Sequence, residues 1–264
     1  MDRSTLIGLL LGWGAFVGAV IWEGGGAGAL GAFWNPPAFL LVIGGTVGAT
    51  VLSFPLDRIR ALPATLRKAF VAGDGPDFGS VIRTLAGLAE RARREGLLAL
   101  EPDVRRQSDP FLKKGLGLAI DGTDPELLRE ILETEIVYLQ RRHHEGANVL
   151  LSMGGFAPTL GVIGTVAGLV FMLLEMSDQE SMGRRISGAF IATLYGVSFA
   201  NLLLLPIGNK LKRRSAAEVL RLEMTVEGIL SIQSGDNPRI VEEKLKAFLS
   251  PEARRAVRTA VGRK

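Results

Sequence analysis

Four long apolar segments alternate with polar stretches along this chain. They are Thr5 to Trp22, Pro37 to Phe54, Met153 to Leu174 and Ile186 to Pro206. A helix rises about 1.5 Å per residue, so about 20 apolar residues cover a hydrocarbon core of about 30 Å. None of the four contains Asp, Glu, Lys, Arg or His. The pattern therefore predicts four transmembrane helices.

Small residues follow one face of each of the last two spans. On the third span the face consists of Pro158, Gly161, Thr165 and Gly168, and on the fourth it consists of Gly188, Ala192, Gly196 and Ala200. Membrane helices associate through small residues, which let their backbones approach. We expect these faces to contact other helices. Packing of the two spans against each other within the chain is the alternative.

The polar stretches also have helical periodicity. Ser80 to Arg94 has an apolar face typical of an amphipathic helix, and Gly96 then interrupts the pattern. A further apolar run, Phe111 to Ile120, precedes Asp124-Pro125, which is a strong helix start. After Pro206 the helical pattern continues to a break at Gly235, and a short helix from Pro238 to Leu249 follows.

We find no strand pattern of any length, so the predicted fold is all-α. The expected division has four parts. They are the first two spans in residues 1–54, a helical cytoplasmic insert in residues 55–147, the third and fourth spans in residues 148–208, and a cytoplasmic C-terminal tail in residues 209–264.

Basic residues indicate the orientation, because Lys and Arg accumulate on the cytoplasmic side of a membrane. Asp57 to Glu145 carries fifteen and the chain from Ile207 onward carries thirteen, whereas Glu23 to Asn35 carries none. The prediction is a multi-pass protein of the cell's inner membrane with both termini in the cytoplasm. Only Arg184 and Arg185 run against this pattern. A cleaved signal peptide is disfavoured, because the first apolar run is long and a second span follows closely.

Several kinds of site are disfavoured by composition. The chain has no cysteine, and the adjacent His143 and His144 lack metal-ligand spacing, so we expect no metal site. No aromatic residues interleave with the basic ones as nucleic-acid stacking requires, so nucleic acid is not an expected partner. The net charge of +4 fits membrane topology and attraction to anionic lipid.

The spans lack the ionisable group that proton relays and ion pumps place at membrane depth. If the protein conducts ions, the titrating carboxylate must belong to a partner. The third and fourth spans offer only hydroxyl and amide groups, which come from Thr159, Thr165, Ser187, Thr193, Ser198 and Asn201.

Several sequence blocks together resemble the MotA/PomA family of flagellar motor stators. They are Pro158 to Thr165, Ala192 to Gly196, Ala200 to Pro206, Arg93 to Glu101 and Ile232 to Arg239. One Gly-Thr pair alone is a weak signal, but these blocks occur in order and span nearly the whole chain.

The resemblance implies a complete ion-driven machine. Members of the family form a ring of five copies around the transmembrane helices of two copies of a MotB/PomB-type single-span partner, which contributes the ion-binding aspartate. Flow of H⁺ or Na⁺ is thought to turn the ring, and the cytoplasmic insert acts on the rotor protein FliG. The expected partners are therefore further copies of the chain, the single-span partner, FliG and membrane lipid. The resemblance also implies neither enzymatic activity nor a cofactor.

The resemblance also implies roles for particular residues. It places Pro158, Thr165, Thr193 and Pro206 in the ion pathway, and it places Arg93, Arg94 and Glu101 at the rotor contact. Each residue has a simpler interpretation. Prolines are tolerated in membrane helices and often only kink them, and exposed charges usually contribute only about 0–1 kcal/mol.

Two other functions stay open at the level of sequence. One is an ExbB/TolQ-type energiser, which couples proton flow to outer-membrane work; such relatives typically have three spans and lack the Arg-x-x-Gly-x-x-x-Leu-Glu block at residues 93–101. The other is a passive membrane scaffold. The ion also stays open, because threonines at positions 165 and 193 look like sodium-type members, yet proton-type members can carry them too.

Overall fold

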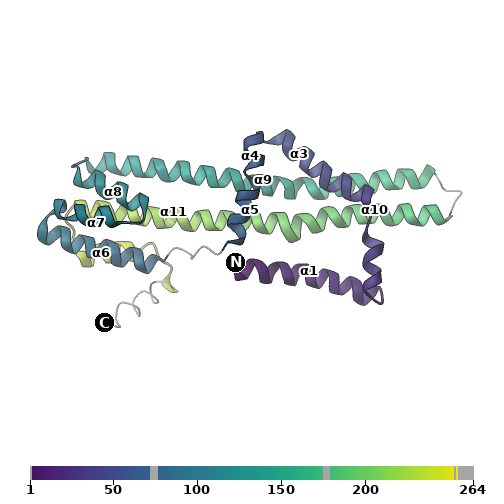
Figure 1. Cartoon of the computed structure of the whole chain (residues 1–264), viewed down its shortest axis with the longest axis horizontal. Coiled ribbons are helices and arrows are strands. Elements are labelled where there is room, and N and C mark those ends of the chain that lie inside the picture. Colours follow the sequence, from purple (N-terminus) through teal and green to yellow (C-terminus); the bar gives the residue numbers. More distant parts are fainter. Residues whose placement is uncertain (1, 72–76, 175–178, 253, 255–264) are drawn as a thin grey trace. The chain divides into compact units, whose positions relative to one another are not determined.

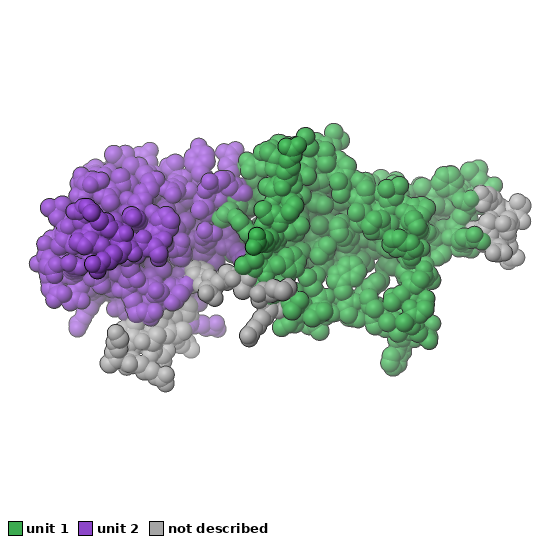
Figure 2. Space-filling model, viewed as in Figure 1, with its two compact units in different colours: residues 1–73, 143–213 green, residues 74–142, 214–264 purple. Residues whose placement is uncertain are grey.

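The computed structural model describes residues 2–71, 77–174, 179–252 and 254, and it contains two compact units (Figures 1 and 2). Unit 1 comprises residues 1–73 and 143–213, and unit 2 comprises residues 74–142 and 214–264. Every regular element in the described ranges is helical, and four helical stretches are long and apolar enough to cross a membrane. The predicted all-α membrane fold is confirmed.

Unit 1 contains the four spans. The first is α1 (Arg3–Glu23). The second follows the short helix η1 (Ala27–Phe33), and it consists of α2 (Pro36–Phe39), the π-helical turn η2 (Leu40–Gly44) and α3 (Gly45–Ser53). Two short helices then follow, α4 (Leu56–Arg60) and α5 (Leu62–Phe70).

The other two spans lie in longer helical stretches. The third is part of α9 (Pro125–Leu174), and the fourth comprises α10 (Gln179–Phe199), the π-helical turn η4 (Ala200–Leu204) and the start of α11 (Leu205–Gln233). Residues 175–178, between the third and fourth spans, lie outside the described residues, as does nearly all of the predicted C-terminal tail after residue 252.

The small-residue faces of α9 and α10 pack against each other. A Cβ added at Gly161 would lie 2.9 Å from the carbonyl oxygen of Ala192, and one at Gly196 would lie 2.4 Å from the carbonyl oxygen of Ala157. Only glycine permits backbones to come this close. The intrachain alternative is therefore what the structure shows for these residues. We call this contact the α9–α10 seam.

Polar contacts also join elements of unit 1 at the ends of the spans. Lys210 on α11 forms an ion pair with Asp2 at 2.6 Å and donates a hydrogen bond to Ser4 at 2.9 Å, beside the first turn of α1. Arg58 on α4 pairs with Glu145 on α9 at 2.7 Å. Charged contacts thus lie at the ends of the spans, outside their apolar interiors.

Unit 2 is a helical cluster around a large aliphatic core. Its own helices are α6 (Phe78–Glu95), η3 (Leu97–Leu100), α7 (Glu101–Arg106), α8 (Pro110–Ile120) and α12 (Pro238–Lys246), joined by parts of α9 and α11. Fully buried side chains include Ile82, Leu85, Leu100, Leu116, Leu128, Leu132, Met224, Ile229 and Leu245. The apolar face predicted for the helix after Ser80 is thus a core face.

Side-chain oxygens cap the helices of unit 2. Asp109 accepts hydrogen bonds from the N–H groups of Phe111 and Leu112, and Asp124 accepts one from Glu126 at 2.9 Å. The helix start predicted at Asp124-Pro125 is confirmed. Helix α7 was missed, because its short stretch of mostly polar residues has no clear apolar period. The division of the sequence into four parts stays a prediction.

Candidate functional site

Thr165 of α9 and Thr193 of α10 meet in the seam. Their hydroxyl groups form a short hydrogen bond with each other. The Thr165 hydroxyl also lies 3.1 Å from the carbonyl oxygen of Gly161 and 3.0 Å from that of Ala189, and the Thr193 hydroxyl lies 3.4 Å from the Gly161 oxygen. The missing side chain of Gly161 lets the two helices approach closely enough for this contact. Two residues that lie 28 positions apart thus form one polar pair.

The threonine pair retains capacity to bind a cation. Each hydroxyl has one hydrogen and two acceptor lone pairs. When one hydroxyl donates to the other and the second donates to a carbonyl, unused lone pairs remain. Both threonines are half-buried, so they are not sealed inside the seam. Hard cations prefer oxygen ligands, but no cluster of His, Asp or Glu that could hold a metal occurs in the described part of the chain.

Pro158 lies two helical turns before Thr165 in the same seam. The Cβ position of Gly196 would be 3.1 Å from the Cα atom of Pro158, so the proline faces a glycine across the contact. Proline has no N–H, and its ring leaves the carbonyl of Gly154 without its usual helical partner. Helix α9 nevertheless continues through Pro158.

Pro206 lies apart from the threonine pair. It is exposed and is the second residue of α11, just after the π-helical turn η4. It lies thirteen positions after Thr193, which corresponds to about 20 Å along the axis. It lines a small cavity of about 290 Å³ together with Asn201, Lys210 and residues of α1. The structure therefore brings Thr165 and Thr193 together, places Pro158 in the same seam, and places Pro206 elsewhere in unit 1.

The charged residues Arg93, Arg94 and Glu101 surround a sharp chain reversal in unit 2. Gly96 separates α6 from η3 with a φ of 85°, which favours glycine. All three charged side chains are exposed. Glu101 pairs with Arg105 at 2.6 Å, and Arg94 lies 3.8 Å from Glu90. Such exposed pairs contribute little to stability, so their charges are available to a partner.

Sequence reasoning missed the contact that fixes this reversal. Arg91 on α6 pairs with Asp103 on α7 at 2.7 Å and with Glu95 at 3.1 Å. The hydrogen bond to Glu95 and the charge of Asp103 raise the pKa of Arg91. The pairing ties α6 to α7 and holds the helix ends that carry the three candidate charges. Nothing in the sequence distinguishes Arg91 from its neighbouring arginines.

Comparison with known proteins relates these sites to a family. Residues 103–224 match the model of the MotA/TolQ/ExbB proton channel family. Motility protein A of Bacillus subtilis is 39% identical over 96% of this chain and 93% of its own length, and chemotaxis protein PomA of Vibrio alginolyticus is 33% identical over 97% and 98%. The chain belongs to the MotA/TolQ/ExbB proton channel family. The resemblance to MotA/PomA proteins is confirmed, and the family is one of ion channels rather than enzymes.

Solved structures extend the similarity to three dimensions. The flagellar MotAB stator complex from Bacillus subtilis contains a chain 38% identical to this one, with a TM-score of 0.89 over 97% of this chain and 99% of that one. The C. jejuni MotAB structure matches at 32% identity, with a TM-score of 0.87 and coverage of 96% and 97%. This chain of the MotA/TolQ/ExbB family thus shares the fold of a stator subunit along nearly its whole length.

Proposed function

We propose that this chain is a stator subunit of the bacterial flagellar motor. With a MotB/PomB-type single-span partner it forms an ion-conducting complex, which converts a proton- or sodium-motive force into torque on the rotor. The observation that carries this proposal is the nearly full-length match to a chain of the flagellar MotAB stator complex, with a TM-score of 0.89. The protein acts as a multi-pass channel subunit of the inner membrane, without enzymatic activity or a cofactor.

The proposed assembly is a ring of five copies around the membrane helices of two partner copies. Two features of unit 1 support it. The apolar spans contain no titratable side chain, so an ion-binding aspartate must come from the partner. In addition, an exposed stripe on α9 continues through Gly155, Thr159, Val162 and Val166, a spacing suited to packing another helix.

The proposed orientation places both termini and the insert in the cytoplasm, in agreement with the distribution of basic residues. The insert then carries Arg93, Arg94 and Glu101 to the rotor protein FliG. Within unit 1, Thr165 and Thr193 supply oxygen atoms beside the ion path. Pro158 and Pro206 permit the helical adjustments that accompany ion passage. The geometry is compatible with H⁺ and with Na⁺.

Co-expression with the single-span partner tests the proposal. We expect a ring whose mass corresponds to five copies of the chain and two of the partner, and we expect it to restore swimming to a strain that lacks its own stator. A stable monomer that ignores the partner would contradict the ring. Rescue of an outer-membrane energisation defect in place of swimming would favour the ExbB/TolQ-type function.

Charge reversal at Arg93 or Glu101 tests the rotor contact separately. The complex should assemble and conduct ions as before, because both residues lie in unit 2 and outside the spans. Rotation should be impaired. The difference between the reversed and the unchanged chain should shrink at higher salt, because salt weakens charge-governed contacts, with a screening length of about 8 Å at physiological ionic strength. Cells with both charges reversed that swim normally would remove these residues from the contact.

A further inference from the structure

A large cavity lies in unit 1 at the end of the spans where α9 ends and α10 begins. Its volume is about 720 Å³, and it is partly open to its surroundings. Helices α9 and α10 and the start of the second span form its walls. Most of its lining is small and apolar, and includes Pro37, Ala38, Leu41, Ala167, Ala189 and Ala192. This cavity is distinct from the threonine pair, and none of the roles proposed above uses it.

The described polar side chains of the cavity offer hydrogen-bond donors and two cations, apart from one amide oxygen. Among the described residues that line it, Asn35, Arg184 and Arg185 are polar and none is acidic. The Asn35 oxygen caps α2 by accepting a hydrogen bond from the Ala38 N–H at 3.0 Å. Its amide nitrogen remains as a donor, and it occupies the space that the missing side chain of Gly188 leaves. The cavity is therefore suited to an anion.

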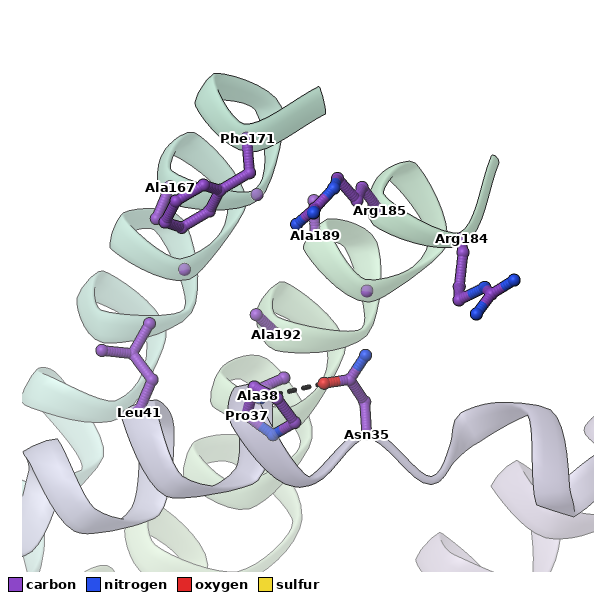
Figure 3. A pocket seen from close by; sticks show the side chains of 13 residues that line it. Asn35, Pro37, Ala38, Leu41, Ala167, Phe171, Arg184, Arg185, Ala189 and Ala192 are labelled. Carbon is purple, nitrogen blue, oxygen red and sulfur yellow. Dashed lines mark hydrogen bonds between the residues drawn. The ribbon is translucent and has the colours of Figure 1, made fainter. Parts of the chain in front are cut away.

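The two arginines differ in direction. Figure 3 shows Arg185 directed from α10 towards α9, which carries Phe171, whereas Arg184 points to the other side of α10. The Arg185 guanidinium lies 5.7 Å from the centre of the Phe171 ring, which orients it by a cation–π contact. A guanidinium has five N–H donors in a planar fork, so contacts to protein groups leave further donors for a phosphate.

The surroundings indicate the depth of the cavity in the membrane. Trp22 and Trp34, near this end of the first two spans, are 89% and 66% exposed. Tryptophan is enriched where a bilayer meets water. An anionic head group at this depth would reach Arg185, and its acyl chains would reach the apolar walls. A free phosphate would fill only a small part of 720 Å³.

We propose that this cavity binds one anionic phospholipid, with its phosphate on Arg185 and Asn35 and its acyl chains against α2 and α9. In the proposed orientation the lipid comes from the outer leaflet. The site gives a reason for Arg185 on a side of the membrane where basic residues are otherwise rare. A lipid held here also supports the outer end of the α9–α10 seam.

Lipid retention by the full chain, purified with its partner, tests the proposal. The complex is reconstituted in bilayers of phosphatidylethanolamine and phosphatidylglycerol, extracted in mild detergent and weighed by native mass spectrometry. We expect phosphatidylglycerol to be retained in preference. Arg185→Gln should weaken that preference by about tenfold, the effect of losing one charged hydrogen bond. Arg184→Gln should have a smaller effect, and Arg239→Gln, an equal charge change in unit 2, should have none.

Two further variants separate the lipid from other occupants. Ala167→Leu fills the cavity without changing charge and should reduce phosphatidylglycerol retention. Because the chain has no cysteine, a single Ala167→Cys can be labelled with a maleimide, and labelling should be faster in bilayers that lack phosphatidylglycerol. Equal retention by the wild type and Arg185→Gln would overturn the proposal. Labelling that is blocked in both bilayers would overturn it too, because a second copy of the chain would then occupy the cavity.

Discussion

Unit 1 and unit 2 join their helices with opposite kinds of side chain. In unit 1 the α9–α10 seam places glycine against backbone, as at Gly161 and Gly196. In unit 2 the helices meet through long aliphatic side chains such as Leu85 and Leu132, both fully buried. The hydrophobic effect drives the second arrangement in water, whereas lipid provides no such drive and favours close backbone contact.

The exposed surfaces differ in the same way. Unit 1 exposes large apolar side chains in its spans, such as Leu10 at 65% and Leu52 at 91%. Unit 2 surrounds its core with ion pairs, such as Lys114 with Glu135 at 2.6 Å. The same chain thus follows two packing rules, and substitutions of equal size should have different consequences in the two units.

The largest expected loss of stability comes from opening a cavity in the core of unit 2. Leu100→Ala removes a fully buried side chain and should lower the stability of unit 2 by about 2–5 kcal/mol. Leu98→Ala is the matched control, because Leu98 lies on the same short helix and is 74% exposed. Hydrogen exchange of peptides from residues 78–106 in the full chain measures both. Equal protection in the two variants would contradict the assignment of this core.

The second-largest loss of stability should come from adding a side chain within the α9–α10 seam. Gly196→Ala places a Cβ 2.4 Å from a backbone oxygen, so α9 and α10 must separate, at a cost near the upper end of about 1–3 kcal/mol. Gly115→Ala in unit 2 meets the tip of Ile229 at 2.5 Å, a side chain that can move, and should cost less. The yield of folded complex and its melting temperature provide the comparison. A larger loss for Gly115→Ala would reverse the proposed contrast.

Acidification should weaken unit 2 through Asp109. Burial raises the pKa of this carboxyl, but the hydrogen bond and charge of Arg221 and the N–H groups of Phe111 and Leu112 outweigh burial and lower it. A carboxyl whose pKa is lower in the folded state stabilises the fold at pH values above its unfolded-state pKa. That stability is lost as the pH falls through the folded-state pKa. We therefore expect unit 2 to lose stability as the pH falls below about 4, where the carboxyl becomes protonated.

Hydrogen exchange of residues 110–120 in the full chain, corrected for the intrinsic rate at each pH, measures this loss. In the Asp109→Asn variant, unit 2 should be less stable near neutral pH. Its stability should also fall less on acidification, because the carboxyl of Asp109 is absent. An unchanged dependence in Asp109→Asn would assign the effect to other carboxyl groups.

The smallest effect on folding is expected at Thr193. Thr193→Val keeps the shape but loses the hydroxyl, and interhelical hydrogen bonds in membranes average about 0.6 kcal/mol. The ring should still assemble, but torque should fall and a higher external ion concentration should be needed for half-maximal speed. Tethered-cell rotation across sodium and, separately, across pH measures this. Thr50→Val is the control, because that buried hydroxyl bonds to its own helix at 2.7 Å. Unchanged curves for Thr193→Val would show that Thr193 only packs.

The sequence was sufficient for features that depend on local patterns. Runs of apolar residues located the four spans, and the Asp124-Pro125 pair located the start of α9, because spans and caps are set within a few residues. The candidate site residues were identified from the resemblance to a family. The contact of Thr165 with Thr193 became visible only when α9 and α10 were placed side by side.

Features that depend on distant residues were missed or left open. The turns η2 and η4 have no local signature, although η4 ends two positions before Pro206. The sequence left open which helices the small residues contact, because small residues suit contacts within a chain and between chains equally. Arg185 was recognised only as an exception to the charge pattern, since Asn35 and Phe171, which share its cavity, lie far away in sequence.

Ion flux into sealed vesicles most directly tests the claim that the spans form a channel only with the partner. The chain is reconstituted alone, with its partner, and with a partner in which the membrane aspartate is changed to asparagine. Flux of H⁺ or Na⁺ is then measured under an imposed potential. We predict flux only with the unmodified partner, because the spans of this chain contain no titratable group. Equal flux from the chain alone would contradict the claim.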